Sequence, residues 1–141
     1  FKYSIEKQVP SFFHSPTEGL VSQKTLKNCT YISKESLYKI NLPNGDIDKL
    51  DIFKKHDYAT CLQIEGDYII VGIEGFCIFL IDLKRFKLLH KISTGHESPH
   101  SFIYCPNRNF LFVASHYSQE ITIYDVLTSK KIYSWQVHKD N

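Results

Sequence analysis

Histidines are the first candidates for chemistry in this chain, because imidazole binds zinc and acts as a general base. Three of them recur with a spacing of about 40 residues, which is a repeat length and not a metal-site spacing. They are His56, His96 and His138. Two histidines lie close together in His96-Glu-Ser-Pro-His100, and Cys105 is a candidate for a third zinc ligand beside them. Both imidazoles would share a face only on a helix, which Pro99 and the flanking strand patterns disfavour. The sequence therefore predicts no metal centre.

Other residues that carry chemistry are scattered. No Gly-x-Ser-x-Gly motif occurs, and the Ser, His and Asp residues form no pattern that nominates a triad. Gly66, Gly72 and Gly75 lie among strand patterns with no helix following, which is typical of turn and packing glycines and not of a phosphate cradle. We predict no catalytic residue, no cofactor and no enzyme activity.

The four cysteines are too far apart for a zinc or redox motif. They are Cys29, Cys61, Cys77 and Cys105. No Cys-x-x-Cys pair occurs, so buried free thiols in a reducing compartment are expected. Asn28-Cys29-Thr30 matches an N-glycosylation pattern, but so short a pattern recurs by chance. The sequence therefore favours an intracellular protein, cytoplasmic or nuclear.

Composition excludes several classes of protein. The 141 residues are 43% hydrophobic and 14% aromatic, enough for a folded core in one domain. Lys+Arg 17 against Asp+Glu 15 leaves a net charge of +2, spread along the chain, so no nucleic-acid footprint is expected. No apolar run reaches the length of a membrane span. The chain starts at Phe1 and contains no Met, from which we expect a piece of a longer protein.

The elements that position these residues are predicted to be short strands. Tyr68 to Ile73 and Phe110 to Ser115 are almost wholly apolar, and polar turns such as Pro43-Asn-Gly-Asp46 separate the runs. No stretch carries a helical stripe. The fold class is therefore all-β, built from four-stranded antiparallel sheets.

The predicted strands recur in three sequence repeats. Asn41, Asp82 and Asp125 each close a strand and lie about 41 to 43 residues apart, which is the period of a β-propeller blade with four strands. We expect blades at 20–55, which is degenerate, at 56–95 and at 96–138. Residues 1–19 are expected to form an N-terminal strand and a loop. Trp135, Tyr133 and Phe53 are expected to pack between blades.

The histidine links add a family resemblance. Gly95-His96 resembles the Gly-His dipeptide of WD40 repeats, and Ile81-Asp82 and Tyr124-Asp125 resemble their Trp-Asp dipeptide. The resemblance implies that His56, His96 and His138 are buried, hydrogen-bonded link residues and that Asp82 and Asp125 have structural roles. It also implies a serine on the second strand of the blade. Ser115 matches that place and Gly72 does not. Propellers of the YVTN kind share the Phe112-Val-Ala-Ser115 pattern, so the subfamily stays open.

Three blades are too few to close a propeller ring. The remainder is expected in a longer chain, in another chain, or in a second copy of this one. The partners implied are therefore protein partners or further propeller blades, or a homodimer.

The function that the sequence favours is a non-enzymatic protein-interaction scaffold that belongs to a larger assembly. The resemblance places partner-binding residues on one face of the ring. They are Lys55, Phe76, Glu97, His116 and Tyr117. One alternative is an enzyme or small-molecule sensor with a site at the central channel, where the innermost strands offer only Thr60, Gln63 and Ser101. Another is a dimerisation module in which two chains close one ring.

Overall fold

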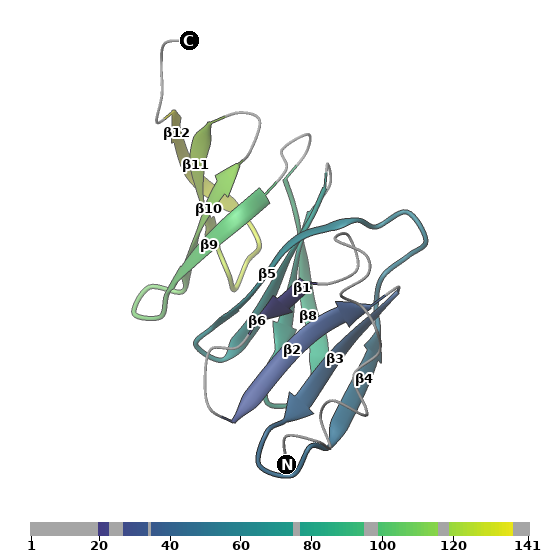
Figure 1. The fold of residues 1–141 in the computed structure, drawn as a ribbon. Coiled ribbons are helices and arrows are strands. Elements are labelled where there is room, and N and C mark those ends of the chain that lie inside the picture. The colour runs from purple at the N-terminus through teal and green to yellow at the C-terminus, as the bar shows by residue number, and fades with distance from the viewer. Residues whose placement is uncertain are drawn as a thin grey trace.

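Every regular element in the described part of the chain is a β-strand, as the sequence predicts. The computed structural model describes residues 20–22, 27–33, 35–74, 77–94, 99–115 and 119–136. These residues form three antiparallel sheets (Figure 1). The first sheet contains β1 (Leu20–Ser22), β2 (Asn28–Ser33), β3 (Ser36–Asn41) and β4 (Ile47–Asp51). The second contains β5 (Ala59–Glu65), β6 (Tyr68–Ile73), β7 (Cys77–Asp82) and β8 (Lys87–Ser93). The third contains β9 (Pro99–Cys105), β10 (Phe110–Ser115), β11 (Glu120–Asp125) and β12 (Lys131–Gln136).

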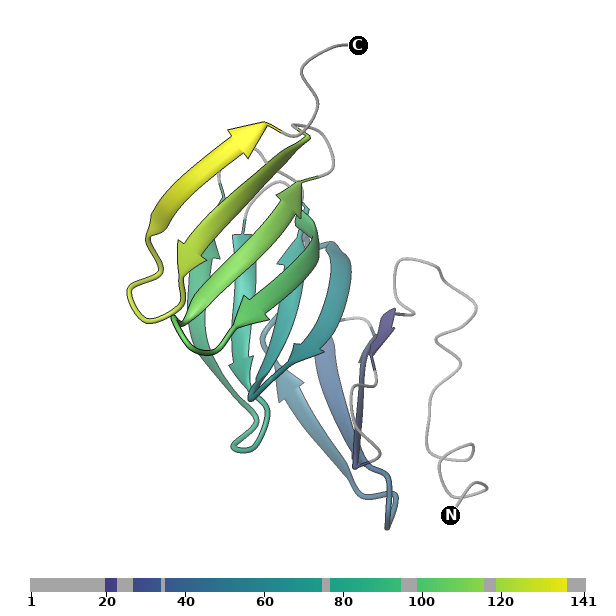
Figure 2. The same ribbon diagram turned by 90° about the vertical axis from the view of Figure 1, so that its left-hand side faces the viewer.

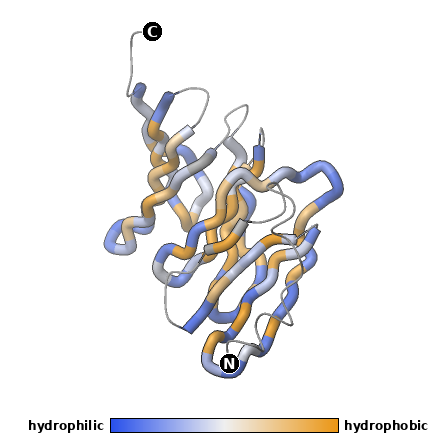
Figure 3. Tube along the Cα trace, viewed as in Figure 1, coloured by the Kyte–Doolittle hydropathy of each residue, from blue (hydrophilic) through white to orange (hydrophobic). Residues whose placement is uncertain are grey.

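Each sheet is a meander in which every strand pairs with the next strand along the chain. The central strands β6 and β7 are buried on both faces, which explains their nearly continuous apolar sequence. Figure 3 shows the apolar residues along the strands and the polar residues at the turns between them. The apolar runs predicted at 68–73 and 110–115 coincide with β6 and β10.

The turn after the third strand is built in the same way in all three sheets. The residue that closes the strand accepts a hydrogen bond on its carbonyl oxygen from the amide four residues later, and that later residue has a positive φ. The pairs are Gly45 to Asn41 at 2.6 Å, Phe86 to Asp82 at 2.9 Å and Ser129 to Asp125 at 2.8 Å, with φ of 77°, 53° and 62°. A left-handed residue lets a hairpin reverse within a short connection. The three residues that mark the repeat in the sequence are therefore structurally equivalent.

The three sheets are stacked face to face in chain order (Figure 2). The first and second sheets share a core in which Phe53 stacks on Phe79, with ring centroids 5.5 Å apart. The second and third share another, where Ile70 and Leu80 meet Phe102 and Val113. β1 and β9 both contact β5, so the first strands of the three sheets lie together. Burial of apolar side chains in these two shared cores stabilises the stack of sheets.

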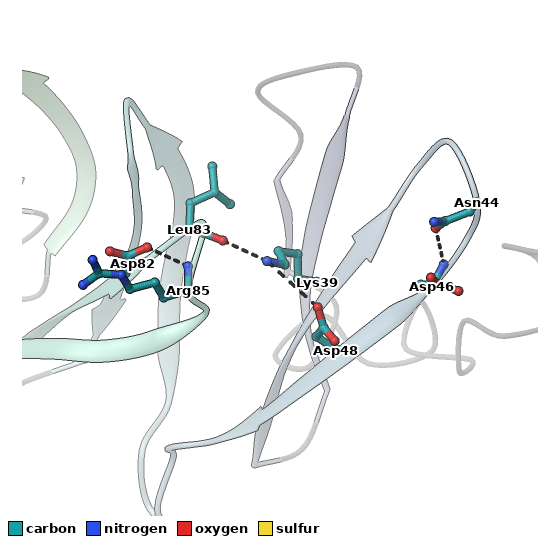
Figure 4. A network of polar contacts seen from close by, with 7 residues as sticks. All are labelled: Lys39, Asn44, Asp46, Asp48, Asp82, Leu83 and Arg85. Carbon is teal, nitrogen blue, oxygen red and sulfur yellow. Dashed lines mark hydrogen bonds and ion pairs between the residues drawn. The ribbon is translucent and has the colours of Figure 1, made fainter.

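Lys39 joins the first sheet to the turn after β7 (Figure 4). Its ammonium group donates to the carbonyl oxygen of Leu83 at 2.9 Å and lies 5.1 Å from the centre of the Phe86 ring. Asp48 is 4.0 Å away. The Lys39 side chain is only 12% exposed, so these contacts replace water around a nearly buried charge. Lys39 is therefore an intersheet contact of the fold.

Two aromatic residues depart from the predicted packing. Phe53 lies between sheets as expected, but Tyr133 and Trp135 on β12 are exposed. They pair with Ile123 and Ile121 of β11, on the face of the third sheet that points away from the second. Within the described residues these two side chains do not pack between sheets, because no described element covers that face.

Candidate functional site

A cleft of about 1010 Å³ lies beside the connection between the first and second sheets. Its walls are the ends of β2, β3 and β4 on one side and residues 53–59 on the other. We call it the link cleft. Among the predicted partner-binding residues, Lys55 lines it and is exposed.

Asp57 fixes the shape of the link. Its carboxylate accepts a hydrogen bond from the Lys54 amide at 2.8 Å, and its own amide donates to the Lys54 carbonyl oxygen at 2.9 Å. This double contact closes a tight turn whose tip is Lys55-His56, both exposed. The preceding residue, Phe53, is buried against Phe79 and anchors the link to the second sheet. The link is therefore anchored at Phe53 and exposed at Lys55-His56.

Charges around the link cleft are balanced. The residues that line it include three lysines, Lys49, Lys54 and Lys55, and three acidic residues, Glu35, Asp51 and Asp57. The Ser36 hydroxyl donates to Asp51, and the Lys49 ammonium lies 3.7 Å from the same carboxylate. This ion pair is exposed on both sides and so contributes little to stability. The exposed tyrosine Tyr58 adds an aromatic surface to the rim. Such a rim suits contact with a polypeptide.

Tyr58 and Asp57 were not among the site residues predicted from the sequence. Asp57 follows a basic pair and precedes a strand, and an Asp that closes a turn onto a residue three positions earlier is a recognisable signal. Tyr58 carries no such signal, because an exposed and a buried tyrosine at a strand end look the same in a sequence.

The predicted blade-link residues have different surroundings. His56 is exposed, so the burial that the WD40 resemblance implies for a link histidine is not found there. Ser115 is buried and has an interaction partner. The strand registers align Ser115 with Ile73 and Ala114 with Gly72, so the sequence comparison of Ser115 with Gly72 is off by one residue. His96 and His138 lie outside the described residues, as do the partner-binding candidates Phe76, Glu97, His116 and Tyr117.

Asp82 and Asp125 have matching roles in two sheets. The Asp82 carboxylate accepts from the Arg85 amide at 2.8 Å. The Asp125 carboxylate accepts from the amides of Leu127 and Thr128 at 2.8 and 3.2 Å. Each side chain satisfies backbone donors of the turn that follows it. Both aspartates stabilise turns within their own sheets.

The innermost strands use their polar side chains to hold the sheets together. The Gln63 side-chain oxygen accepts from the Phe102 amide of β9 at 2.6 Å, and the Thr60 hydroxyl donates to the Pro99 carbonyl oxygen. Gly72 lies directly beneath this contact. A Cβ added there would be 2.8 Å from both the Pro99 oxygen and the Cys61 sulfur. Thr60 and Gln63 are therefore engaged in the fold.

Thiol chemistry is suppressed at two cysteines. Burial raises the pKa of Cys61 to about 11, although hydrogen bonds from Thr60 and Gly72 oppose the shift. Burial also raises the pKa of Cys77 to about 11, with Asp57 raising it further and Lys91 opposing. Since the thiolate is the nucleophile, both side chains are unreactive near neutral pH. All four cysteines are free and half-buried. In the described part of the chain no group of His, Cys, Asp and Glu is arranged to hold a metal ion.

Comparisons with known proteins identify the fold. A chain of the mitotic checkpoint complex aligns with a TM-score of 0.73 and 18% identity, over 85% of this chain and 37% of that one. U3-55K aligns with a TM-score of 0.71 and 12% identity, over 89% of this chain and 42% of that one. Hydrazine synthase of Kuenenia stuttgartiensis aligns with a TM-score of 0.67 and 12% identity, over 84% and 35%. No protein-family model and no curated protein matches the sequence.

These likenesses support a β-propeller-like fold, as the sequence predicts. The chain spans well under half of each of these three proteins. Their names include both a checkpoint complex and an enzyme, so the shared fold alone does not indicate a function. No helix among the described residues is long and apolar enough to cross a membrane.

Proposed function

We propose that this chain is a non-enzymatic, WD40-like scaffold that binds protein partners as a subunit or domain of a larger assembly. The observation that carries the proposal is the link cleft, which two packed sheets hold open with Lys55 and Tyr58 at its rim. Loops that a rigid frame positions are frequent binding sites. Mixed charge and an exposed aromatic ring favour a polypeptide ligand over a small molecule.

The structural neighbours support a role in an assembly. One of them is part of the mitotic checkpoint complex, which by its name is a multi-component assembly. An intracellular location, cytoplasmic or nuclear, belongs to the same proposal. Its support is the set of four free thiols, which persist in reducing compartments.

An enzyme or sensor with a site on the innermost strands is the less favoured function. Such a site needs polar side chains that are available to a substrate. Thr60 and Gln63 are hydrogen bonded to β9 instead. The nearby Cys61 thiol is held in its unreactive protonated form.

The proposal is tested by comparing the proteins that the immobilised chain retains from a cell extract. Lys55→Glu and Tyr58→Ser change the rim of the link cleft without touching a buried side chain. We expect at least one protein to be retained by the wild-type chain and lost with both variants, since exposed tyrosines are enriched among the residues that dominate binding.

Matched controls separate the cleft from general effects. Lys84→Glu reverses a charge in an exposed turn of the second sheet, and Leu127→Ser removes an exposed apolar side chain from a turn of the third. Neither residue lines the link cleft. If the retained proteins depend equally on the control positions, or on none of the four, the link cleft is not the binding surface and the proposal fails.

A further inference from the structure

The last strand of the third sheet, β12, lies at a free edge, as Figure 2 shows. Its only neighbour in the sheet is β11, so one row of its backbone amide and carbonyl groups has no strand partner among the described residues. The strand that contacts β5 of the second sheet is β9, at the opposite edge. The outer edge of β12 is therefore open to another strand.

The side chains of β12 differ from those of the outer strands in the other two sheets. Leu50 of β4 packs against the core that the first and second sheets share, and Ile92 of β8 is fully buried. No side chain of β12 is buried, and Ile132, Tyr133 and Trp135 are 47%, 60% and 37% exposed. Large apolar side chains grouped on one exposed strand are typical of an interaction surface.

The usual protection of an edge strand is weak in β12. Charged side chains along an edge hinder the addition of another strand. In β4, charged residues alternate with apolar ones as Ile-Asp-Lys-Leu-Asp, and β8 carries Lys87 and Lys91. In β12 the only charged residue is Lys131, at the first position, and Ile-Tyr-Ser-Trp-Gln follows it. Of the three outer strands, β12 is therefore the one best suited to strand addition.

We propose that β12 pairs antiparallel with β12 of a second copy of this chain. The sequence of the strand supports this occupant because it is complementary to itself. Tyr133 and Trp135 lie on one face, where they pair with Ile123 and Ile121 of β11, and their ring centroids are 5.9 Å apart. When Ser134 lies opposite Ser134 of the second copy, each Tyr133 lies opposite a Trp135. The pairing thus brings four aromatic rings together on one face, around a two-fold axis.

Other registers match the side chains less well. A pair centred between two residues would place Tyr133 opposite Ser134, whose side chain lies on the other face. A pair centred on Tyr133 would place Trp135 opposite Lys131 and leave only one aromatic pair. The register centred on Ser134 is therefore the favoured one, since cross-strand aromatic pairs stabilise a sheet.

The resulting dimer joins the third sheets of two copies into one sheet of eight strands, four from each copy. It differs from a ring closed by two chains, because the copies meet at a strand edge and the ends of each stack stay free. The link cleft lies between the first and second sheets and takes no part in the pairing. Self-association through β12 is therefore independent of the proposed binding role of the cleft.

The register is tested by disulfide crosslinking of the full chain. In the proposed pair the two residues at position 134 are directly opposite, with Cα atoms about 4.5–5.5 Å apart, which a disulfide can span. Ser134→Cys should therefore form a covalent dimer under mild oxidation. Ile132→Cys is the control on the same strand, because the two residues at position 132 would lie roughly 13 Å apart. It should give only the background of the wild-type chain, whose four cysteines are half-buried.

Self-association without an added cysteine is measured by light scattering over a dilution series. The wild-type chain should have the mass of a dimer at high concentration and of a monomer after dilution. Ser134→Lys places two like charges opposite each other and should raise the dissociation constant about tenfold or more. Leu127→Lys is the matched control, because Leu127 lies in a turn and is 64% exposed. It should leave the dissociation constant unchanged.

Two results would overturn the proposal. One is a wild-type chain that stays monomeric at every concentration. The other is a dimer in which Ser134→Cys crosslinks no better than Ile132→Cys, since the copies then meet through another surface.

Discussion

Gln63 of β5 accepts a hydrogen bond from the backbone amide of Phe102 of β9 at 2.6 Å, although 39 residues separate them. β9 is an edge strand of the third sheet, and it contacts β5 of the second sheet. The bond therefore joins the backbone of one sheet to a side chain of the neighbouring sheet. Together with the hydrogen bond from Thr60 to Pro99, it links β5 of the second sheet to β9 of the third.

Replacing Gln63 by leucine should destabilise the fold, because the Phe102 amide would lose its partner. An unsatisfied buried backbone donor costs about 1–3 kcal/mol. The measurement is urea denaturation followed by circular dichroism. Gln136→Leu provides the control, since Gln136 is exposed at the end of β12. Equal shifts in the two variants would argue against an intersheet role for Gln63.

A methyl group at Gly72 should also destabilise the protein. In Gly72→Ala the new Cβ meets the Pro99 oxygen, which is backbone and cannot move independently. Overpacking of this kind costs about 1–3 kcal/mol. The equivalent position in the third sheet is Ala114, where Ala114→Gly should cost about 0.5–1 kcal/mol through backbone entropy alone. A stability gain in Gly72→Ala, read from the thermal midpoint, would contradict the close packing.

Asp82 and Asp125 should contribute similar, additive increments to stability. Each substitution by alanine removes a side-chain hydrogen-bond acceptor from a turn and should lower the free energy of unfolding by about 1 kcal/mol. The double variant should lose the sum, because the residues lie in different sheets and share no partner. Denaturant midpoints of the four proteins provide the test. Strong non-additivity would mean that the two turns are coupled.

Alkaline pH should weaken the fold through its buried thiols. The folded state raises the pKa of Cys61 from 9.0 to about 11, so the folded protein retains a proton that the unfolded chain releases. This stabilising contribution is complete below pH 9 and is lost as pH rises through about 11. The free energy of unfolding should therefore fall across that window, and Cys61→Ala should flatten the slope. If the slope is unchanged in the variant, groups other than Cys61 cause the loss of stability at alkaline pH.

Much of the fold can be predicted from the sequence. The apolar runs at Tyr68–Val71 and Phe110–Val113 predict strands covered on both faces. This is confirmed for β6, whereas in β10 buried and half-buried residues alternate, so only one of its faces is covered within the described residues. Asn41, Asp82 and Asp125 predict the repeat. These signals are local, because strand propensity and turn chemistry depend on neighbouring residues. The structural equivalence of the three turns confirms that the repeat is real.

The site residues were harder to predict because their partners are distant in the sequence. Gln63 and Thr60 looked like free polar groups on an inner strand, yet both bind β9. Trp135 and Tyr133 have the spacing of core residues, and nothing in an apolar strand tells whether its second face is covered. His56 matches a family position by spacing but lies on an exposed turn, since Asp57 closes the link beneath it.

The central claim, that the link cleft binds a protein, is tested most directly by a photo-crosslinking amino acid placed at Tyr58 in the full chain and activated in cells. The same amino acid at Leu127 reports on an exposed position outside the cleft. If the link cleft binds a protein, position 58 gives a discrete crosslinked protein that Lys55→Glu abolishes, and position 127 gives no such product. No crosslink from position 58, or the same products from positions 58 and 127, would contradict a binding role for the link cleft.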